Sequence, residues 1–436
     1  MSALLAAKSD PASAGSWPAA ANLVATWLER RERVDTLLES LPRSLHGANR
    51  ARCQHLVLGV VRHFGRIEAA LGRLIAHPPR FSTRAVLFIA GFELIEAAAD
   101  RDDGRIAKIV HHAVEQTKSL ASPAEARLVN AVVRKLAPAL ARPAPTLNVD
   151  AEELAEYFSH PAWLIRHWLA QFGPESTRAL LEWNQQPAPI YGRWRADAEP
   201  LPDFLKPTRW PGVLEVESGR WPDVEPALKA GKLYLQDPST RIPVALLAPV
   251  AGEAVLDLCA APGGKSLLLA DTMKQGRLVA VDLPTVRLDR LKENLSRVVG
   301  VEVALVQADL LENIGVVLRE HRLPAVFDAV LLDVPCSNTG VMRHRIDVKW
   351  RLQAGDFKKH PQQQLSLLHA AARLVAPGGR LVYSTCSIDP EENERVVAAF
   401  LASKAGGPFV AAGQTLSFPW TSGHDGGAAF RLNRVG

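Results

Sequence analysis

The sequence has few cysteines for its length. Only four occur among 436 residues, and no two of them stand at the close spacing that metal-binding pairs show. We therefore expect neither a disulfide framework nor a bound metal. This cysteine usage is typical of a protein of the reducing cytoplasm, where we place this chain.

Long hydrophobic runs are absent as well. No stretch approaches about 18 consecutive apolar residues, so the sequence predicts no membrane-spanning helix and no membrane partner. The first residues, MSALLAAKSDPASAGSWP, lack a basic segment followed by a long apolar one. We therefore expect no signal peptide.

Composition nevertheless supports a folded protein of several domains. Hydrophobic residues make up 47% and charged residues 22% of the chain, which is ordinary for globular proteins and excludes wholesale disorder. At about 150 residues per domain, this length suggests about three domains.

The basic charge is concentrated at the amino-terminal end. Net charge is +5, but residues 1–150 hold 20 Lys and Arg against 14 Asp and Glu. The remainder is close to neutral. This asymmetry fits a domain that binds RNA, and it fits a solvated basic surface equally well.

Hydrophobic periodicity divides the chain into three parts. Residues 20–140 repeat apolar positions at helical spacing and end in a Pro/Ala linker. Residues 151–245 hold six of the ten tryptophans and many prolines, which predicts a small mixed domain. We place the three domains at residues 1–145, 146–245 and 246–436.

The third part alternates short apolar runs with helical segments. The runs AVLDL, RLVAVD, VALVQAD, DAVLLD and RLVYST each predict a buried parallel strand; they cover residues 254–258, 277–282, 303–309, 328–333 and 380–385. Together they predict a doubly wound α/β domain, whose ligands bind beyond the carboxyl ends of the strands.

Each predicted strand ends in or next to an acid or a thiol. Asp257 precedes a glycine turn, residues 259–265, that lacks the glycine spacing of a phosphate loop or a dinucleotide fingerprint. Asp282 follows about 20 residues later, where an acid can bond a ribose diol. A ribose site without a pyrophosphate motif favours S-adenosylmethionine over NAD. Asp309 is then expected near the adenine.

Two cysteines follow neighbouring strands, Cys336 after the fourth and Cys386 after the fifth. A thiolate can add to C6 of a pyrimidine and make C5 nucleophilic enough to accept a methyl group. Asp333, three residues before Cys336, can assist at the ring nitrogen. Two structural thiols or a redox pair are the alternatives, and the residues alone do not say which thiol attacks.

Three long motifs resemble the NOL1/NOP2/Sun family of RNA cytosine-5 methyltransferases: LDLCAAPGGKS, DVPCSNTGVMRHRIDVKW and YSTCSIDPEENE. Near the amino terminus, GVVRHFGRIEAALGRLI, VLFIAGFELIE, AVEQTKSL and ARLVNAVVRKL resemble a NusB-like RNA-binding domain. The resemblance implies an all-α NusB-like domain, a small α+β middle domain and a Rossmann-like methyltransferase domain with a mostly parallel sheet.

The resemblance also assigns roles to residues. It implies that Cys386 is the nucleophile, that Cys336 helps to release the product, and that Asp333 contributes to catalysis. The implied positions for S-adenosylmethionine are Cys259, Ala260, Ala261, Pro262, Gly263, Gly264, Lys265, Asp282, Asp309 and Asp333. The basic segment 343–359 suggests phosphate contacts through Arg343, Arg345, Lys349 and Arg351.

The implied partner is RNA, namely 16S rRNA or an assembling small subunit, and we expect a monomer. Departures from the family pattern at Ile346 and over residues 425–430 bear on the target base and its context. Other interpretations are the same chemistry on tRNA or another rRNA site, a non-catalytic assembly factor that binds RNA, and a nucleotide-binding redox protein.

Overall fold

A computed structural model describes residues 15–100, 102–146, 150–285, 287–312 and 314–436. The expectation about a signal peptide falls mainly on residues 1–14, outside these ranges. The chain forms two compact units. The helical unit comprises residues 1–186 and 346–351, and the sheet unit comprises residues 187–345 and 352–436. None of the helices in the described part of the chain has both the length and the apolar character of a membrane span.

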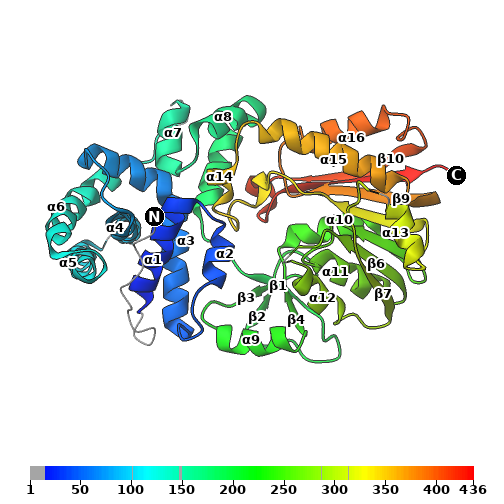
Figure 1. The fold of residues 1–436 in the computed structure, drawn as a ribbon, viewed down its shortest axis with the longest axis horizontal. Coiled ribbons are helices and arrows are strands. Elements are labelled where there is room, and N and C mark those ends of the chain that lie inside the picture. The colour runs from blue at the N-terminus through cyan, green and yellow to red at the C-terminus, as the bar shows by residue number, and fades with distance from the viewer. Residues whose placement is uncertain (1–14, 101, 147–149, 286, 313) are drawn as a thin grey trace, which may run out of the picture. The chain divides into compact units, whose positions relative to one another are not determined.

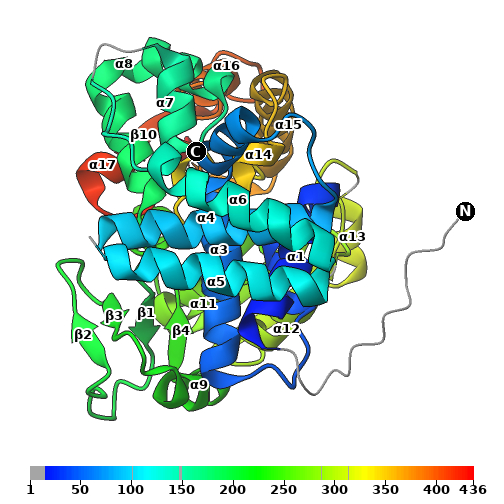
Figure 2. The same ribbon diagram turned by 90° about the vertical axis from the view of Figure 1, so that its left-hand side faces the viewer.

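Helices account for the regular structure of the helical unit as far as it is described. They are α1 (Ser16–Arg30), α2 (Val34–Glu39), α3 (Gly47–Leu74), α4 (Phe81–Ala99), α5 (Asp103–Leu120), α6 (Pro123–Leu140), α7 (Ala151–Phe158), α8 (Ala162–Gln185) and α14 (Val348–Arg351). Helices α4, α5 and α6 lie side by side (Figure 2). Helix α4 is the most buried, because apolar residues cover nearly its whole circumference.

Local sequence sets several helix ends. The side chains of Asp102, Ser122 and Asp150 each accept a hydrogen bond from the backbone N–H three residues later, which caps α5, α6 and α7. Helix α8 is kinked at Gly173, whose φ of 75° precedes Pro174. The caps at Asp102 and Ser122 are readable from sequence, and the helical prediction for residues 20–140 is confirmed.

A hexapeptide from late in the chain completes the helical unit. Ile346 is buried in its hydrophobic core. The Trp350 indole N–H donates to the backbone oxygen of Val61 at 2.9 Å, and its ring meets Phe64 edge-on. Residues 346–351 therefore belong structurally to the amino-terminal helices, although methyltransferase-like motifs surround them in sequence.

The sheet unit contains a seven-stranded sheet. Its order is β10-β11-β9-β8-β5-β6-β7. The strands are β5 (Ala254–Leu258), β6 (Gly276–Asp282), β7 (Val301–Gln307), β8 (Phe327–Asp333), β9 (Val375–Thr385), β10 (Phe409–Ser417) and β11 (Gly427–Arg434). Strands β5 to β9 run parallel to one another and confirm the five predicted strands, whereas β10 and β11 pair antiparallel at one edge.

Helices cover both faces of this sheet (Figure 1). One face packs against α13 (Ile314–Glu320), α15 (Asp356–Ala372) and α16 (Glu394–Leu401). The other packs against α10 (Arg241–Leu247), α11 (Gly264–Met273) and α12 (Leu288–Leu295). Leu256 and Val255 point to opposite faces because side chains alternate along a strand.

The segment 146–245, expected as one small domain, is divided between the units. Helices α7 and α8 belong to the helical unit, where the Ser159 hydroxyl accepts from the Gly65 backbone N–H at 2.7 Å. The rest forms a small antiparallel sheet of order β2-β3-β1-β4 beside α9 (Trp221–Lys229). Its strands are β1 (Tyr191–Trp194), β2 (Leu205–Pro207), β3 (Leu214–Val216) and β4 (Leu233–Leu235).

Candidate active site

The site lies at the carboxyl ends of β5, β6, β8 and β9. These strands are parallel neighbours, so the residues that follow them share one edge of the sheet. Asp282 and Asp333 are the last residues of β6 and β8. Cys386 directly follows β9. The structure thus brings together most residues that the strand ends predicted.

The two expected thiols are neighbours. The Sγ atoms of Cys336 and Cys386 lie 3.1 Å apart, and both cysteines are free. Cys336 is buried and Cys386 is half-buried. The hydrogen bond with Cys386, followed by burial, raises the pKa of Cys336 well above the usual value of a thiol. Cys336 is therefore a neutral thiol at neutral pH, while Cys386 is the more accessible of the two.

Buried hydroxyls join the loops that carry the thiols. Ser337, Thr339 and Ser387 exchange hydrogen bonds of 3.1 to 3.3 Å. The Thr339 and Ser387 hydroxyls also donate to the Asp389 carboxylate. Sequence favours a helix start at Asp389 and Pro390, but α16 begins only at Glu394, because the Asp389 side chain is committed to this network.

The buried side chain of Glu392 also connects the loops that carry Cys336 and Cys386. Its carboxylate accepts from the Ser337 backbone N–H at 3.0 Å and from the Gln364 amide at 2.7 Å. Burial raises the pKa of Glu392. The Tyr383 hydroxyl donates to the Glu392 backbone oxygen at 2.6 Å. These contacts make both cysteine loops part of one rigid hydrogen-bonded assembly.

Asp333 and Lys265 form an ion pair beside the thiols. The Lys265 Nζ lies 2.7 Å from the Asp333 carboxylate, whose other oxygen accepts from the Ser384 hydroxyl at 2.7 Å. Burial opposes the charge of Lys265, but Asp333 outweighs burial and raises the pKa of Lys265. Lys265 is therefore charged at neutral pH, and the two side chains can present polar atoms to a planar base.

The glycine turn is held against β6. The Ala261 backbone N–H donates to the Asp282 carboxylate at 2.7 Å, and Asn294 donates to the Pro262 oxygen at 2.7 Å. Gly263 has φ 98°, and a Cβ there would lie 2.8 Å from Leu291. Asp309, after β7, accepts from the Leu311 N–H at 2.8 Å. The turn thus fixes the position of the Asp282 carboxylate.

Two further groups line the start of this turn. Burial raises the pKa of Asp257 to about 7. One Asp257 oxygen accepts from Ser266 at 2.5 Å, and the other is buried without a partner among the described residues. Burial, followed by the charges of Asp282 and Asp333, raises the pKa of Cys259. Cys259 is thus a neutral thiol and no nucleophile.

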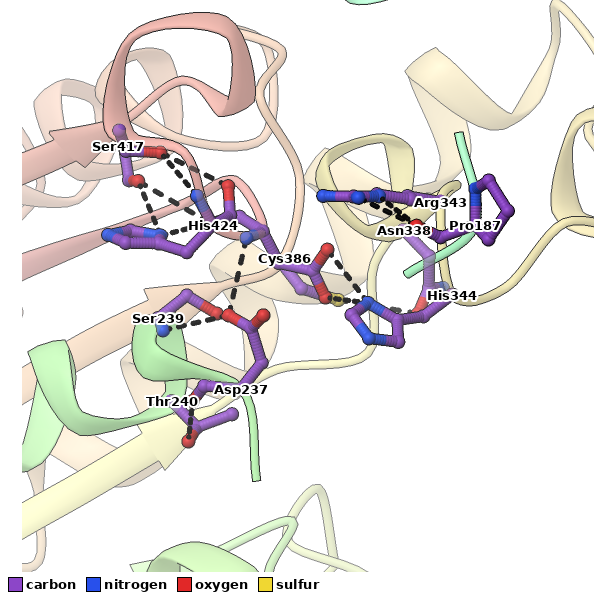
Figure 3. Close-up of polar contacts among 12 residues, drawn as sticks. Pro187, Asp237, Ser239, Thr240, Asn338, Arg343, His344, Cys386, Ser417 and His424 are labelled. Atoms are coloured by element: carbon purple, nitrogen blue, oxygen red, sulfur yellow. Dashed lines mark hydrogen bonds and ion pairs between the residues drawn. The ribbon is translucent and has the colours of Figure 1, made fainter. Parts of the chain in front are cut away.

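Sequence reasoning missed two polar groups near Cys386 (Figure 3). Asn338 accepts from the Cys386 thiol at 3.3 Å. His344 lies 2.9 Å from the Asp425 carboxylate, and Asp237 accepts from the Asp425 backbone N–H at 3.2 Å. Burial opposes the charge of His344, but Asp425 outweighs it and raises the His344 pKa. No spacing rule connects residues so distant in sequence.

Two of the four expected phosphate contacts are wrong. Lys349 is 1% exposed, and its Nζ donates to the Arg62 backbone oxygen at 3.0 Å. Arg343 is 8% exposed, and its guanidinium donates twice to the Pro187 oxygen. Both cations therefore bind backbone carbonyl oxygens inside the protein and do not face an RNA phosphate. Arg345 is exposed and Arg351 is half-buried, so these two stay predictions.

Comparisons with known proteins agree with this architecture. A family model described as "16S rRNA methyltransferase RsmB/F" matches residues 244–413, and the NusB family model matches residues 18–138. "Ribosomal RNA small subunit methyltransferase B" of Klebsiella pneumoniae is 31% identical over 394 residues, 88% of each chain. The protein of the same description from Erwinia tasmaniensis is 30% identical over 93% of this chain and 96% of its own.

Solved structures share the fold. The crystal structure of PH0851 has a TM-score of 0.74 at 24% identity and covers 97% of this chain and 99% of its own. NSun6 from Pyrococcus horikoshii, solved with SFG, has a TM-score of 0.54 at 18% identity and covers 63% of this chain and 98% of its own. The order of helices and strands described above is thus shared with proteins solved by crystallography.

Proposed function

The chain belongs to the family of 16S rRNA methyltransferases RsmB/F, and on that premise we propose that it methylates C5 of a cytosine in 16S rRNA with S-adenosylmethionine as the methyl donor. One observation carries the proposal. Two free thiols lie 3.1 Å apart at the ends of β8 and β9, beside the Lys265–Asp333 ion pair. A nucleophile, a second thiol and groups that bond a base are what this reaction needs.

The residues around the glycine turn fit the methyl donor. The Asp282 carboxylate at the end of β6 suits a ribose diol. The unpartnered Asp257 oxygen is an acceptor that the ammonium of the methionine part would satisfy. Gly263 precedes α11 and has no side chain to cap it, so the first backbone N–H groups of the helix suit the carboxylate of the methionine part. Bound there, S-adenosylmethionine supplies an electrophilic methyl group.

Cys386 opens the reaction. Its sulfur, having lost its proton to solvent, would bond to C6 of the cytosine while the electron pair of the C5–C6 double bond moves toward C5. C5 would then take the methyl group, and the methyl donor would leave as S-adenosylhomocysteine. Loss of the C5 proton then restores the double bond and expels the sulfur as a thiolate. The Asp333 carboxylate and the Lys265 ammonium lie beside the thiols, where they can bond the edge of the base.

Cys336 serves the release step. The hydrogen bond that the Cys336 thiol donates to the Cys386 sulfur is the main cause of the high Cys336 pKa, because it favours the protonated form. Once the Cys386 sulfur is bonded to carbon, it is a poorer acceptor, so this cause weakens and Cys336 ionises more readily. A Cys336 thiolate formed at that stage can accept the C5 proton. Cys336 can therefore act as a base only after the bond between the Cys386 sulfur and C6 of the cytosine has formed.

Complementation in cells that lack the gene tests the proposal. Wild type should restore one cytosine-5 methyl mark in 16S rRNA, read by bisulfite sequencing of ribosomal and transfer RNA. Cys386→Ala should restore none. Cys336→Ala should accumulate protein that stays attached to RNA after denaturation, because the adduct forms and is not released.

Cys53→Ala, a buried cysteine of the helical unit, is the matched control and should behave as wild type. A mark lost from tRNA or from another rRNA site would keep the chemistry and overturn the substrate. Unchanged RNA everywhere would favour an assembly factor that binds RNA without modifying it. Normal turnover by Cys336→Ala would overturn its role in release. An assembling small subunit as partner and a monomeric state remain predictions.

A further inference from the structure

One face of the small antiparallel sheet lies against α11, the helix that follows the glycine turn (Figure 1). Strand β1 pairs with β4 so that Arg193 is directly opposite Tyr234, which places both side chains on this face. Arg195 follows two residues after Arg193 and shares the face, because side chains alternate along a strand. Leu233 points to the opposite face, into the hydrophobic core of the small sheet. The face that meets α11 thus carries two cations and one phenol.

An ion pair holds this face against α11. The Arg195 guanidinium donates to both carboxylate oxygens of Asp271, at 2.7 and 2.9 Å, and Arg193 bonds the same carboxylate. Asp271 lies about two helical turns after Gly264, so the two residues belong to one face of α11. Because β1 and β4 are paired, the ion pair also fixes the place of Tyr234 at the start of α11.

The Tyr234 hydroxyl reaches the glycine turn from this position. A Cβ added at Gly264 would lie 2.8 Å from Tyr234 Oη, so the hydroxyl occupies the space that a side chain would need. Asn294 donates from Nδ2 to Tyr234 Oη at 3.3 Å and to the Pro262 oxygen at 2.7 Å. Arg297 donates to Oδ1 of Asn294 at 3.4 Å, which fixes the end of the amide that faces the turn. Each of the two N–H groups on Nδ2 therefore has one acceptor.

We propose that Tyr234 is a positioning residue for the methyl donor, which acts through Asn294 on the Pro262 carbonyl and so holds the glycine turn in the shape that binds S-adenosylmethionine; this rests on the proposed place of the donor at that turn. Asn294 is 7% exposed, so water does not readily replace a lost acceptor. Without the hydroxyl, the amide must leave one N–H unpaired or turn toward another acceptor and away from Pro262. In both cases the turn loses support, and affinity for the donor falls.

Removal of the hydroxyl alone tests the proposal, because Tyr234→Phe keeps the ring beside Gly264. The full chain is titrated with S-adenosylhomocysteine by isothermal titration calorimetry, a readout that requires no methyl transfer. Affinity should fall by about three- to tenfold, the usual effect of losing one hydrogen bond. In steady-state methylation of 16S rRNA, KM for S-adenosylmethionine should rise by a similar factor, whereas kcat and KM for RNA should change by less than about twofold.

Tyr157→Phe is the matched control. Tyr157 lies on α7 of the helical unit, where its ring contacts the Arg66 guanidinium. Loss of this hydroxyl should leave the affinity for S-adenosylhomocysteine unchanged, and thermal unfolding should show that both variants are folded. Equal affinities for wild type and Tyr234→Phe would overturn the proposal. Changes in kcat and in KM for RNA as large as the change in KM for the donor would also overturn it, because they would indicate a general structural defect.

A double-mutant cycle tests whether Tyr234 acts through Asn294. Asn294→Leu removes the amide and keeps a side chain of similar size. In that background Tyr234→Phe should have at most about half of its effect on affinity, because the contact between the two residues is already lost. Effects of equal size in both backgrounds would overturn the coupling. Methyl transfer by Cys386→Ala would instead overturn the proposed function, and that outcome is independent of the calorimetry.

Discussion

Asp257 makes the stability of the sheet unit depend on pH. Burial raises its pKa to about 7, whereas the unfolded chain has an ordinary carboxyl with a pKa of about 4. The folded chain therefore binds this proton more tightly. The stability it contributes is complete below about pH 4 and is lost as pH rises through about 7.

Replacing this carboxyl should remove that dependence. Relative to Asp257→Asn, the free energy of unfolding of the wild type should fall by up to about 1.4 kcal/mol per pH unit between pH 5 and 7. Urea denaturation at pH 5, 6 and 7 measures it. Glu225→Gln, an exposed acid of α9, should differ from wild type by a constant amount. Parallel curves for wild type and Asp257→Asn would show that Asp257 does not titrate in this range.

A single residue could be predicted only where a feature of the sequence determines its position in the fold. Asp282, Asp333 and Cys386 were found because chain direction in a parallel sheet carries strand ends to one edge. Lys349 was misplaced because a count of charges does not reveal an internal carbonyl that binds an ammonium. Asn338 lies in a motif that the sequence analysis singled out, but its contact with Cys386 could not be predicted, since it depends on an atom brought by another loop.

At the scale of elements, the glycine turn depends on one residue with no side chain. Gly263→Ala would strain a backbone with φ 98° and press a methyl group against Leu291 at 2.8 Å. Because the turn carries the contact to Asp282, we expect affinity for S-adenosylhomocysteine to fall more than tenfold. Isothermal titration calorimetry measures this.

A control variant separates the effect of backbone strain from the effect of the close contact with Leu291. Gly378→Ala meets a similar φ of 75°, with nothing within 4 Å of the added carbon. Both changes cost about 1 to 2 kcal/mol of backbone strain, yet Gly378→Ala should leave the affinity within twofold. Equal affinities for the two variants would mean that the turn does not depend on close contact at Gly263.

The strands of the large sheet differ in whether the sequence predicted them. Strands β5, β6, β8 and β9 are mostly buried on both faces, so each reads as an apolar run. Strand β7 lies at the sheet edge and is only partly buried, but its sequence shows a similar run. Strand β10 was missed because it is an edge strand whose middle residues are exposed, and its sequence includes Gly413 and Gln414. Strand β11 was missed with it, because its sequence turns polar after Phe430, at Arg431, Asn433 and Arg434.

At the scale of the whole molecule, the charge asymmetry predicts where RNA affinity originates. The excess of basic residues lies within residues 1–150. Arg33, Arg43, Lys108 and Lys135 are exposed there. Replacing them by Gln should weaken RNA binding and flatten its dependence on salt, by about 0.7 to 0.9 in the log–log slope for each phosphate that the protein no longer neutralises.

Binding titrations between 50 and 200 mM salt, roughly the range over which such ion pairs act, measure this slope. Replacing four exposed residues of the sheet unit by Gln, namely Lys274, Arg319, Arg373 and Lys404, removes the same total charge and should have the smaller effect. The same slope for both sets would mean that the helical unit does not anchor RNA.

The hexapeptide 346–351 also sets the order in which the protein is made. The helices through residue 186 leave the ribosome first, yet their core lacks Ile346 and Trp350 until synthesis has passed residue 351. At 5 to 20 residues per second, roughly 8 to 33 seconds separate these events. During that interval the nascent helical unit exposes the apolar surface that this peptide later covers. The amino-terminal unit, though first to emerge, is therefore completed only after most of the chain has been translated.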